Sequence, residues 1–305
     1  MSTPLTEPVV GWAAGVPFTA LPPSVNGQDQ DQDPNQGRGP APLIVAWHLM
    51  DAPRSDAAFA AALPLAGVHA WRVYLGMPLV GRRPVEGAYE AAQADPMLRY
   101  VGPVVRQATE EFPAALEVLR ERFPCGDGPI GIVGGSLGGT VALNVLARVR
   151  VNIAAVALVN PAIRARTAVE VFSAAHGTSY PWGEQARSGA DELDFVAHAA
   201  LIRARDPAPA LLVVSGEHDY PLSRVDATEL VAALGGAGPA SGGNGRNGAG
   251  SANGRNRGPE RIRLETIPGL DHPLAEQPGV EPAPQTPLAR VVDETVTAWF
   301  RTHLR

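Results

Sequence analysis

Short apolar runs alternate with helical stretches along most of the sequence, and this alternation restricts the fold more than any other feature. The runs that fit buried strands are residues 43–47, 70–75, 130–133, 153–159 and 211–214. The stretches with helical periodicity are residues 55–63, 104–123, 140–148, 228–234 and 288–304. A helix between two such strands carries the chain back to the start of the next strand, which makes the strands parallel. The sequence therefore predicts an α/β fold with a doubly wound, mostly parallel sheet that helices cover on both faces.

Local signals add detail to the predicted sheet. Val9–Val10 and residues 16–21 are predicted to form a short opening hairpin, and residues 261–267 alternate polar and apolar side chains as an edge strand does. Ser55 is a candidate N-cap for the helix that follows it. Pro113 is predicted to kink the helix over residues 104–123 or to begin a new helix there.

Residues 162–209 break the alternation. They lie between two predicted strands, are too many for a simple crossover, and include several aromatic residues. We therefore predict that they form a small helical cap over the carboxyl edge of the sheet. Phe172, Tyr180 and Trp182 are predicted to line a substrate pocket under this cap. The alternative is that the three rings form only the core of the cap itself.

Two segments have compositions typical of disorder. Residues 26–40 carry no large apolar side chain, and residues 235–259 are rich in Gly, Asn, Ala, Ser and Arg. Such segments bury too little apolar surface to offset the entropy lost on ordering. Strong strand and helix signals resume after each of them. We therefore expect two surface loops within a single domain that spans residues 1–305.

Composition excludes several classes of function. The net charge is −6, whereas a nucleic-acid-binding domain normally has a basic surface. The single cysteine, Cys125, cannot form an intramolecular disulfide. Residues 1–7 lack the basic and apolar regions of a signal peptide, and no apolar run reaches the roughly 18 residues of a bilayer span. We expect a cytoplasmic protein that acts on a small molecule, without a nucleic-acid or membrane partner; the oligomeric state stays open.

The motif Gly134-Gly135-Ser136-Leu137-Gly138 follows a predicted strand and begins a predicted helix. Reversal from strand to helix within about three residues forces the serine into a strained backbone conformation, and the flanking glycines remove the Cβ atoms that would collide. The start of the helix presents free N–H groups beside the serine. Ser136 is therefore the candidate nucleophile, and the Leu137 N–H is a candidate donor to an oxyanion.

A serine nucleophile needs a base, and in this arrangement the acid and the base follow the serine in that order. His272 lies in a loop directly after the last predicted strand, from which it can reach the sheet edge. His218 lies too close in sequence to Asp219 to pair with it, and His303 belongs to the last helix. His272 is therefore the predicted base.

The predicted acid is Asp219, which follows the strand over residues 211–214. Glu217, on the extension of that strand, and Asp226, near the next helix, are the rivals. A second oxyanion donor is expected from the loop after residues 43–47, where the N–H groups of Leu49 and Met50 are candidates. His48 precedes the serine and is predicted to brace this loop rather than to act as a base.

Three motifs together resemble the α/β-hydrolase superfamily: residues 134–138, the acid segment 215–219 and the base segment 268–272. The nearest likeness is to the esterase, dienelactone hydrolase and prolyl-oligopeptidase-like branch, and it covers the chain from Pro42 onward. The resemblance implies an eight-stranded sheet, a Ser136–Asp219–His272 triad, and no metal or organic cofactor. One departure is that the His-Gly pair usual after the early strand is His48-Leu49 here.

The resemblance implies a hydrolase that cleaves a carboxylic ester or a related acyl bond through an acyl-enzyme on Ser136. A serine peptidase and an acyltransferase are alternatives, because they use the same triad. A non-catalytic binding protein with the same fold is the alternative from another class.

Overall fold

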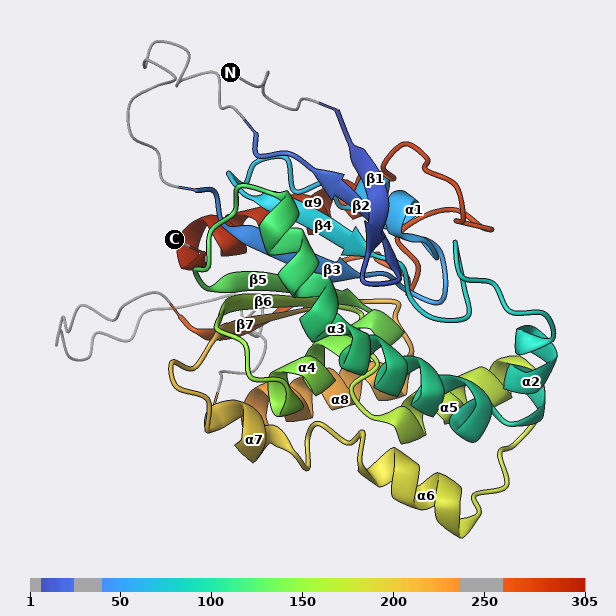
Figure 1. Ribbon diagram of the computed structural model, residues 1–305. Helices are drawn as coiled ribbons and strands as arrows, with labels where there is room; N and C mark the ends of the chain where they lie inside the picture. The colour runs from blue at the N-terminus through green and yellow to red at the C-terminus, as the bar shows by residue number, and fades with distance from the viewer. Residues whose placement is uncertain (1–6, 25–39, 236–259, 305) are drawn as a thin grey trace, which may run out of the picture.

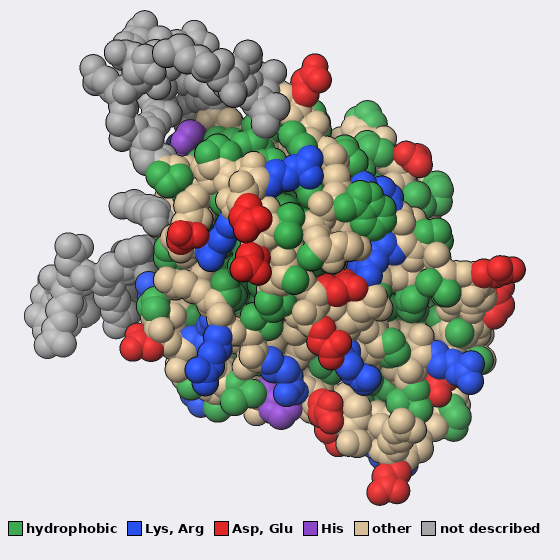
Figure 2. All heavy atoms as spheres, viewed as in Figure 1, with side chains coloured by type: hydrophobic (Ala, Val, Ile, Leu, Met, Phe, Trp, Pro, Cys, Tyr) green, Lys and Arg blue, Asp and Glu red, His purple; other side chains and the backbone are tan. Residues whose placement is uncertain are grey.

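The computed structural model describes residues 7–24, 40–235 and 260–304 (Figure 1). Apart from Pro40 and Gly235, the segments predicted to be disordered lie outside these ranges. Acidic and basic side chains are interspersed on the face that Figure 2 shows. No helix in the described ranges combines the length and the apolarity that crossing a membrane requires.

The described residues form an eight-stranded sheet with the order β1-β2-β4-β3-β5-β6-β7-β8. The strands are β1 (Val9–Ala13), β2 (Val16–Leu21), β3 (Leu43–Trp47), β4 (Trp71–Leu75), β5 (Ile130–Gly135), β6 (Ile153–Val159), β7 (Ala210–Gly216) and β8 (Ile262–Ile267). β1 pairs antiparallel with β2, and β2 with β4, whereas every pairing from β4 to β8 is parallel. The mostly parallel sheet is confirmed, with the opening hairpin at one edge and β8 at the other.

The strand order places a topological switch point between β3 and β5. From β3 the chain adds β4 on one side, and it then returns to add β5 on the other side. Connections that leave neighbouring strands in opposite directions open a crevice at the carboxyl ends of those strands, and α/β proteins bind ligands there. The loop after β3 and the motif after β5 therefore meet in this crevice.

Helices cover both faces of the sheet (Figure 1). α1 (Asp56–Ala62) and α9 (Pro287–His303) pack on one face, and α3 (Gly102–Arg122), α4 (Leu137–Arg148) and α8 (Pro221–Ala233) pack on the other. Side chains of β3 alternate between the two cores: Val45 belongs to the α3–α4 side, and Ile44 and Ala46 to the α9 side. Two buried faces explain why the strands are apolar throughout.

The predicted helix boundaries hold to within a few residues, with one larger difference. Ser55 caps α1, because its side chain accepts a hydrogen bond from the Ala58 N–H at 3.1 Å. α8 begins at Pro221, well before the predicted residue 228, since proline is well suited to the first turn of a helix. α3 is one helix with Pro113 inside it, so Pro113 begins no new helix.

Residues 162–209 contain three helices between β6 and β7, as the cap prediction requires: α5 (Ala165–Ala175), α6 (Glu184–Asp191) and α7 (Ala199–Arg203). Arg164, just before α5, is paired with Asp194 at 3.3 Å and with Glu229 of α8 at 2.5 Å. These ion pairs fix the start of α5 against α8.

A second inserted segment has no counterpart in the sequence predictions. Between β4 and α3 lie α2 (Ala88–Ala94) and a π-helical turn, η2 (Met97–Val101), and α5 and α6 both pack against η2. Tyr180 joins the two segments by donating its hydroxyl to Asp95 Oδ1 at 2.5 Å. The covering over the carboxyl edge of the sheet is therefore built from two insertions.

The two neighbouring valines of α9 test the packing of this fold. Val292 is fully buried, whereas the Val291 side chain is 41% exposed. We expect Val292→Ala to lower the free energy of unfolding by about 2 kcal/mol, because it removes buried methyl groups and leaves a void. Val291→Ala is the control, with an expected change within about 0.5 kcal/mol. Urea denaturation of the two variants measures both, and equal losses would contradict the observed face of α9.

Candidate active site

Ser136 lies between β5 and α4 in a strained backbone conformation, with φ 47° and ψ −118°. A positive φ is unfavourable for a residue with a Cβ, so surrounding contacts must hold it. A Cβ on Gly134 would lie 2.5 Å from the Gly138 carbonyl oxygen, and one on Gly138 would collide with the carbonyls of Trp47 and His48. The glycines therefore permit the close backbone approach that the motif predicts.

Backbone hydrogen bonds fix the strained turn. The Ser136 N–H donates to the Val159 carbonyl at 3.0 Å. The Ser136 carbonyl accepts from the N–H groups of Gly139 at 2.9 Å and Ala162 at 3.0 Å. The turn is thus bonded both to the end of β6 and to the first residue of the cap segment.

The structure brings the three predicted residues into one hydrogen-bonded chain. His272 Nε2 lies 2.8 Å from Ser136 Oγ, and His272 Nδ1 lies 2.7 Å from Asp219 Oδ1. The side chain of His272 is 11% exposed and that of Asp219 is 1% exposed. A carboxylate only accepts hydrogen bonds, so Nδ1 carries the proton and Nε2 is free to accept the proton of the serine hydroxyl.

Asn160, just after β6, connects the two loops that carry the acid and the base. Its Oδ1 accepts from the Gly216 N–H at 2.7 Å, and its Nδ2 donates to the carbonyls of Asp271 and His272, each at 2.9 Å. Asn160 is fully buried with φ 43°, a conformation that asparagine tolerates better than most residues. No role is predicted for Asn160 from the sequence alone. Its place directly after a buried strand is the one signal that points to the carboxyl edge of the sheet.

The rival residues lie outside this chain of hydrogen bonds. Glu217 accepts from the Gly269 N–H at 2.9 Å, and Asp226 is paired with Arg164. His218 Nδ1 lies 3.7 Å from Asp271 Oδ1, and the ring of His303 contacts the ring of Trp299. Each of these residues therefore has its own contacts away from Ser136.

His48 is fully buried and braces the loop after β3, as predicted. Its Nδ1 lies 2.5 Å from the Leu49 carbonyl oxygen, and its Nε2 accepts from the Met77 N–H at 3.2 Å. A carbonyl accepts and an N–H donates, so the imidazole is neutral with its proton on Nδ1. Burial lowers the pKa of His48 to about 4, which keeps it neutral near pH 7.

Two residues predicted to supply oxyanion donors lie in the wall of the cavity at Ser136. Leu137 and Met50 line the same cavity as Ser136, and Leu137 begins α4, where the N–H groups have no partner within the helix. The side chain of Leu49 instead packs so closely against Gly135 that a Cβ there would collide with it. The N–H groups of Leu49 and Met50 both stay candidates for the second donor.

A cavity of about 360 Å³ opens beside Ser136 and His272. Both inserted segments contribute its largely apolar wall, which includes Leu79, Val80, Tyr100, Ala168, Val171 and Phe172. Phe172 thus lies where it was predicted. Tyr180 and Trp182 are not among the residues that line this cavity. They pack edge to face with centroids 4.8 Å apart, and Arg166 lies over the Trp182 ring, so they stabilise the cap.

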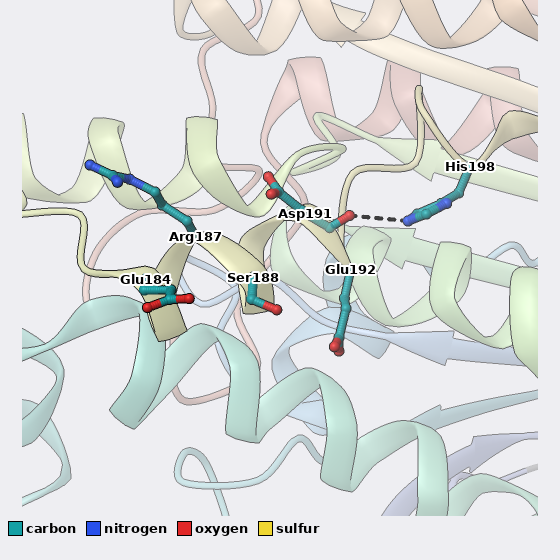
Figure 3. Close-up of a pocket in the computed structure, with 6 residues that line it drawn as sticks. All are labelled: Glu184, Arg187, Ser188, Asp191, Glu192 and His198. Carbon is teal, nitrogen blue, oxygen red and sulfur yellow. Dashed lines mark hydrogen bonds between the residues drawn. The ribbon is translucent and has the colours of Figure 1, made fainter.

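A separate hollow lies along α6 and shares no residue with the cavity at Ser136. Figure 3 shows its wall, including Ser188, Asp191 and His198, with His198 Nε2 donating to the Asp191 carbonyl at 3.0 Å. No hydrogen bond joins Ser188 to His198 in the described structure, so the hollow has no nucleophile–base pair. Within the described ranges, no three His, Cys, Asp or Glu side chains cluster as metal ligands do.

Solved structures that share this architecture have low sequence identity to the chain. A protein from Thermus thermophilus is 20% identical with a TM-score of 0.55, over 96% of this chain and 97% of that one. An esterase domain from a Rhodothermus marinus protein is 14% identical with a TM-score of 0.53, over 98% and 99%. The chain has the α/β-hydrolase fold.

Larger proteins with the α/β-hydrolase fold also match. A puromycin-hydrolysing peptidase from Mycobacterium tuberculosis is 15% identical with a TM-score of 0.60, and the match spans 98% of this chain but 40% of the peptidase. No protein-family model and no curated protein matches the chain. The comparisons therefore give the α/β-hydrolase fold, and the chemistry must be argued from the site.

Asn160→Gly tests whether this residue positions the base. Glycine keeps the positive φ accessible, so the change removes mainly the side chain that joins the two loops. We expect kcat for a generic activated ester to fall about 10- to 100-fold with little change in KM, because misplaced catalytic groups lose rate. Asn144→Ala is the control: Asn144 is also buried and bridges Thr109 and Arg148 on α3 and α4. Equal kcat values for the two variants would contradict the positioning role.

The neutral state of His48 predicts a pH dependence of stability. Between pH 6.5 and about 4 the unfolded chain binds a proton at His48 that the folded chain does not, so the free energy of unfolding falls as the pH falls. The slope from this residue is at most about 1.4 kcal/mol per pH unit. Compared with His48→Gln, the wild type is expected to lose stability progressively across this range, which urea titrations at several pH values measure. A constant difference between the two proteins would contradict a buried neutral imidazole.

Proposed function

We propose that the protein is a serine hydrolase that cleaves a carboxylic ester or a related acyl bond through an acyl-enzyme on Ser136. The observation that carries the proposal is the hydrogen-bonded chain from Ser136 through His272 to Asp219, with distances of 2.8 and 2.7 Å. This chain opens into a cavity at the carboxyl edge of the sheet. A nucleophile, a base and an orienting acid within hydrogen-bond reach are the requirements for acyl transfer to serine.

In the acylation step Ser136 Oγ attacks the carbonyl carbon while His272 Nε2 takes the hydroxyl proton. Asp219 holds the imidazole in the required tautomer and stabilises the imidazolium that forms. In this proposal the N–H groups of Leu137 and of Leu49 or Met50 bind the developing oxyanion. The imidazolium then protonates the leaving group.

Deacylation repeats these steps with water as the nucleophile. His272 Nε2 takes a proton from the water, and the hydroxide formed attacks the acyl carbon. Collapse of the second oxyanion releases the acid, and the proton on His272 returns to Ser136 Oγ. The reaction consumes one ester and one water and releases one acid and one alcohol.

The size of the cavity favours a small substrate over a large one. Two inserted segments surround a cavity of about 360 Å³, a volume suited to a small molecule. Peptidases are among the proteins that share the fold, and they and acyltransferases use the same acyl-enzyme. Amide substrates and alcohol acceptors therefore belong in the first substrate screen beside esters.

Ser136→Ala tests the proposal directly. We expect the wild type to hydrolyse p-nitrophenyl acetate and to be labelled covalently by a fluorophosphonate probe. The alanine variant is expected to lose the labelling and at least about a thousandfold of kcat, since the nucleophile is gone.

Ser223→Ala is the matched control, because Ser223 is a serine in the wall of the same cavity that forms no hydrogen bond to His272 among the described residues. It is expected to keep the labelling. A wild-type protein that neither reacts with the probe nor turns over esters and amides would instead be a binding protein with this fold.

A further inference from the structure

Arg54 contributes a positive charge to the wall of the Ser136 cavity. It lies in the loop between β3 and α1, and its side chain is half-buried. Within the described part of the chain, its guanidinium forms no hydrogen bond and no ion pair, whereas Arg82 and Arg83 each pair with a carboxylate. A half-buried guanidinium beside a reactive serine is therefore available to a ligand.

Tyr100 of η2 lines the same cavity and adds a second donor. Its hydroxyl has no hydrogen-bond partner among the described residues. Burial raises the pKa of Tyr100 to about 12, and the nearby positive charge of Arg54 opposes this rise. The tyrosine is therefore a neutral hydroxyl close enough to Arg54 to feel its charge.

Two further polar side chains of the cavity wall have hydrogen bonds within the protein. Asp51 Oδ1 accepts from the Ala52 N–H at 3.0 Å and from the Gln277 amide. His176 has its Nδ1 2.8 Å from the Phe172 carbonyl oxygen and its Nε2 3.3 Å from the Tyr89 hydroxyl. Most of the remaining wall is apolar. Among the described residues, the groups of this wall without a hydrogen-bond partner are the Arg54 guanidinium and the hydroxyls of Tyr100, Tyr220 and Ser223. A cation with neutral hydroxyl donors beside it suits an anion.

We propose that Arg54, assisted by Tyr100, binds a carboxylate on the substrate, so that the enzyme prefers esters whose acyl or leaving part bears a free carboxylate. This inference rests on the proposed function of Ser136. A guanidinium presents a planar pair of N–H donors that matches the two oxygens of a carboxylate. The Asp51 carboxylate in the same cavity offsets part of the positive charge, which favours a single negative charge over a phosphate dianion.

Matched substrate pairs test the preference. For the acyl side, monoethyl adipate is compared with its amide, ethyl 6-amino-6-oxohexanoate. For the leaving-group side, 4-acetoxybenzoate is compared with 4-acetoxybenzamide, and 4-acetoxyphenyl phosphate supplies the dianion. We expect kcat/KM to be about 10- to 100-fold higher for the carboxylate in at least one pair, as a charge-assisted hydrogen bond provides.

Variants assign that preference to the two residues. Arg54→Gln is expected to abolish it while changing kcat/KM for the neutral partner less than about threefold, and Tyr100→Phe is expected to reduce it. Arg99→Gln is the matched control, because it removes the same charge from an exposed residue that precedes Tyr100 and does not line the cavity. It is expected to keep the preference.

Three results would overturn the inference and leave the proposed function intact. The first is that the wild type has equal kcat/KM values for the carboxylate and the amide in both substrate pairs. The second is that Arg54→Gln loses kcat/KM equally on the charged and the neutral substrate. The third is that the wild type prefers 4-acetoxyphenyl phosphate over 4-acetoxybenzoate.

If no ester is hydrolysed, the proposed function fails. A ligand-binding experiment then tests the carboxylate site at Arg54 by itself. Adipate is then expected to raise the Tm of Ser136→Ala while adipamide does not, and Arg54→Gln is expected to remove the shift. The absence of a shift with adipate would overturn the site itself.

Discussion

The backbone of α4 approaches the ends of β3 and β5 so closely that only glycine fits at the points of contact. Gly134 and Gly138 face carbonyl groups of the opposite segments at distances that exclude a Cβ. This contact forces Ser136 to a positive φ and directs its side chain out of the sheet edge. The placement of the nucleophile, and of the free N–H groups at the start of α4, depends on this one contact.

The acid and the base are held by backbone loops rather than by rigid strands. Asp219 follows β7, and His272 follows β8, so their mutual position depends on how these two loops are tied together. Asn160 contributes three hydrogen bonds to that tie, and the His218 N–H adds another by donating to the Leu270 carbonyl at 2.9 Å. A buried amide with every polar group satisfied is well suited to fix such a geometry.

Two inserted segments form much of the wall of the cavity beside Ser136. The segment between β4 and α3 and the segment between β6 and β7 pack on each other through η2, α5 and α6. Their contact is strengthened by the bond from Tyr180 to Asp95. The same packing brings Tyr100 to the cavity wall that Arg54 also lines. The environment of any substrate is therefore set by the insertions, whereas the triad is set by the sheet.

The sequence by itself indicated the order of the strands and most of the helices, the candidate nucleophile, and the candidate acid and base that follow it. These features leave local signals: apolar runs of strand length, glycines at a turn, and a carboxylate and a histidine directly after strands. Such signals did not predict α2 and η2, and they did not show that Tyr180 and Trp182 lie outside the wall of the cavity at Ser136. Only the tertiary structure decided which side chains face the serine, because that depends on how two distant insertions pack against each other, and no local pattern encodes that packing.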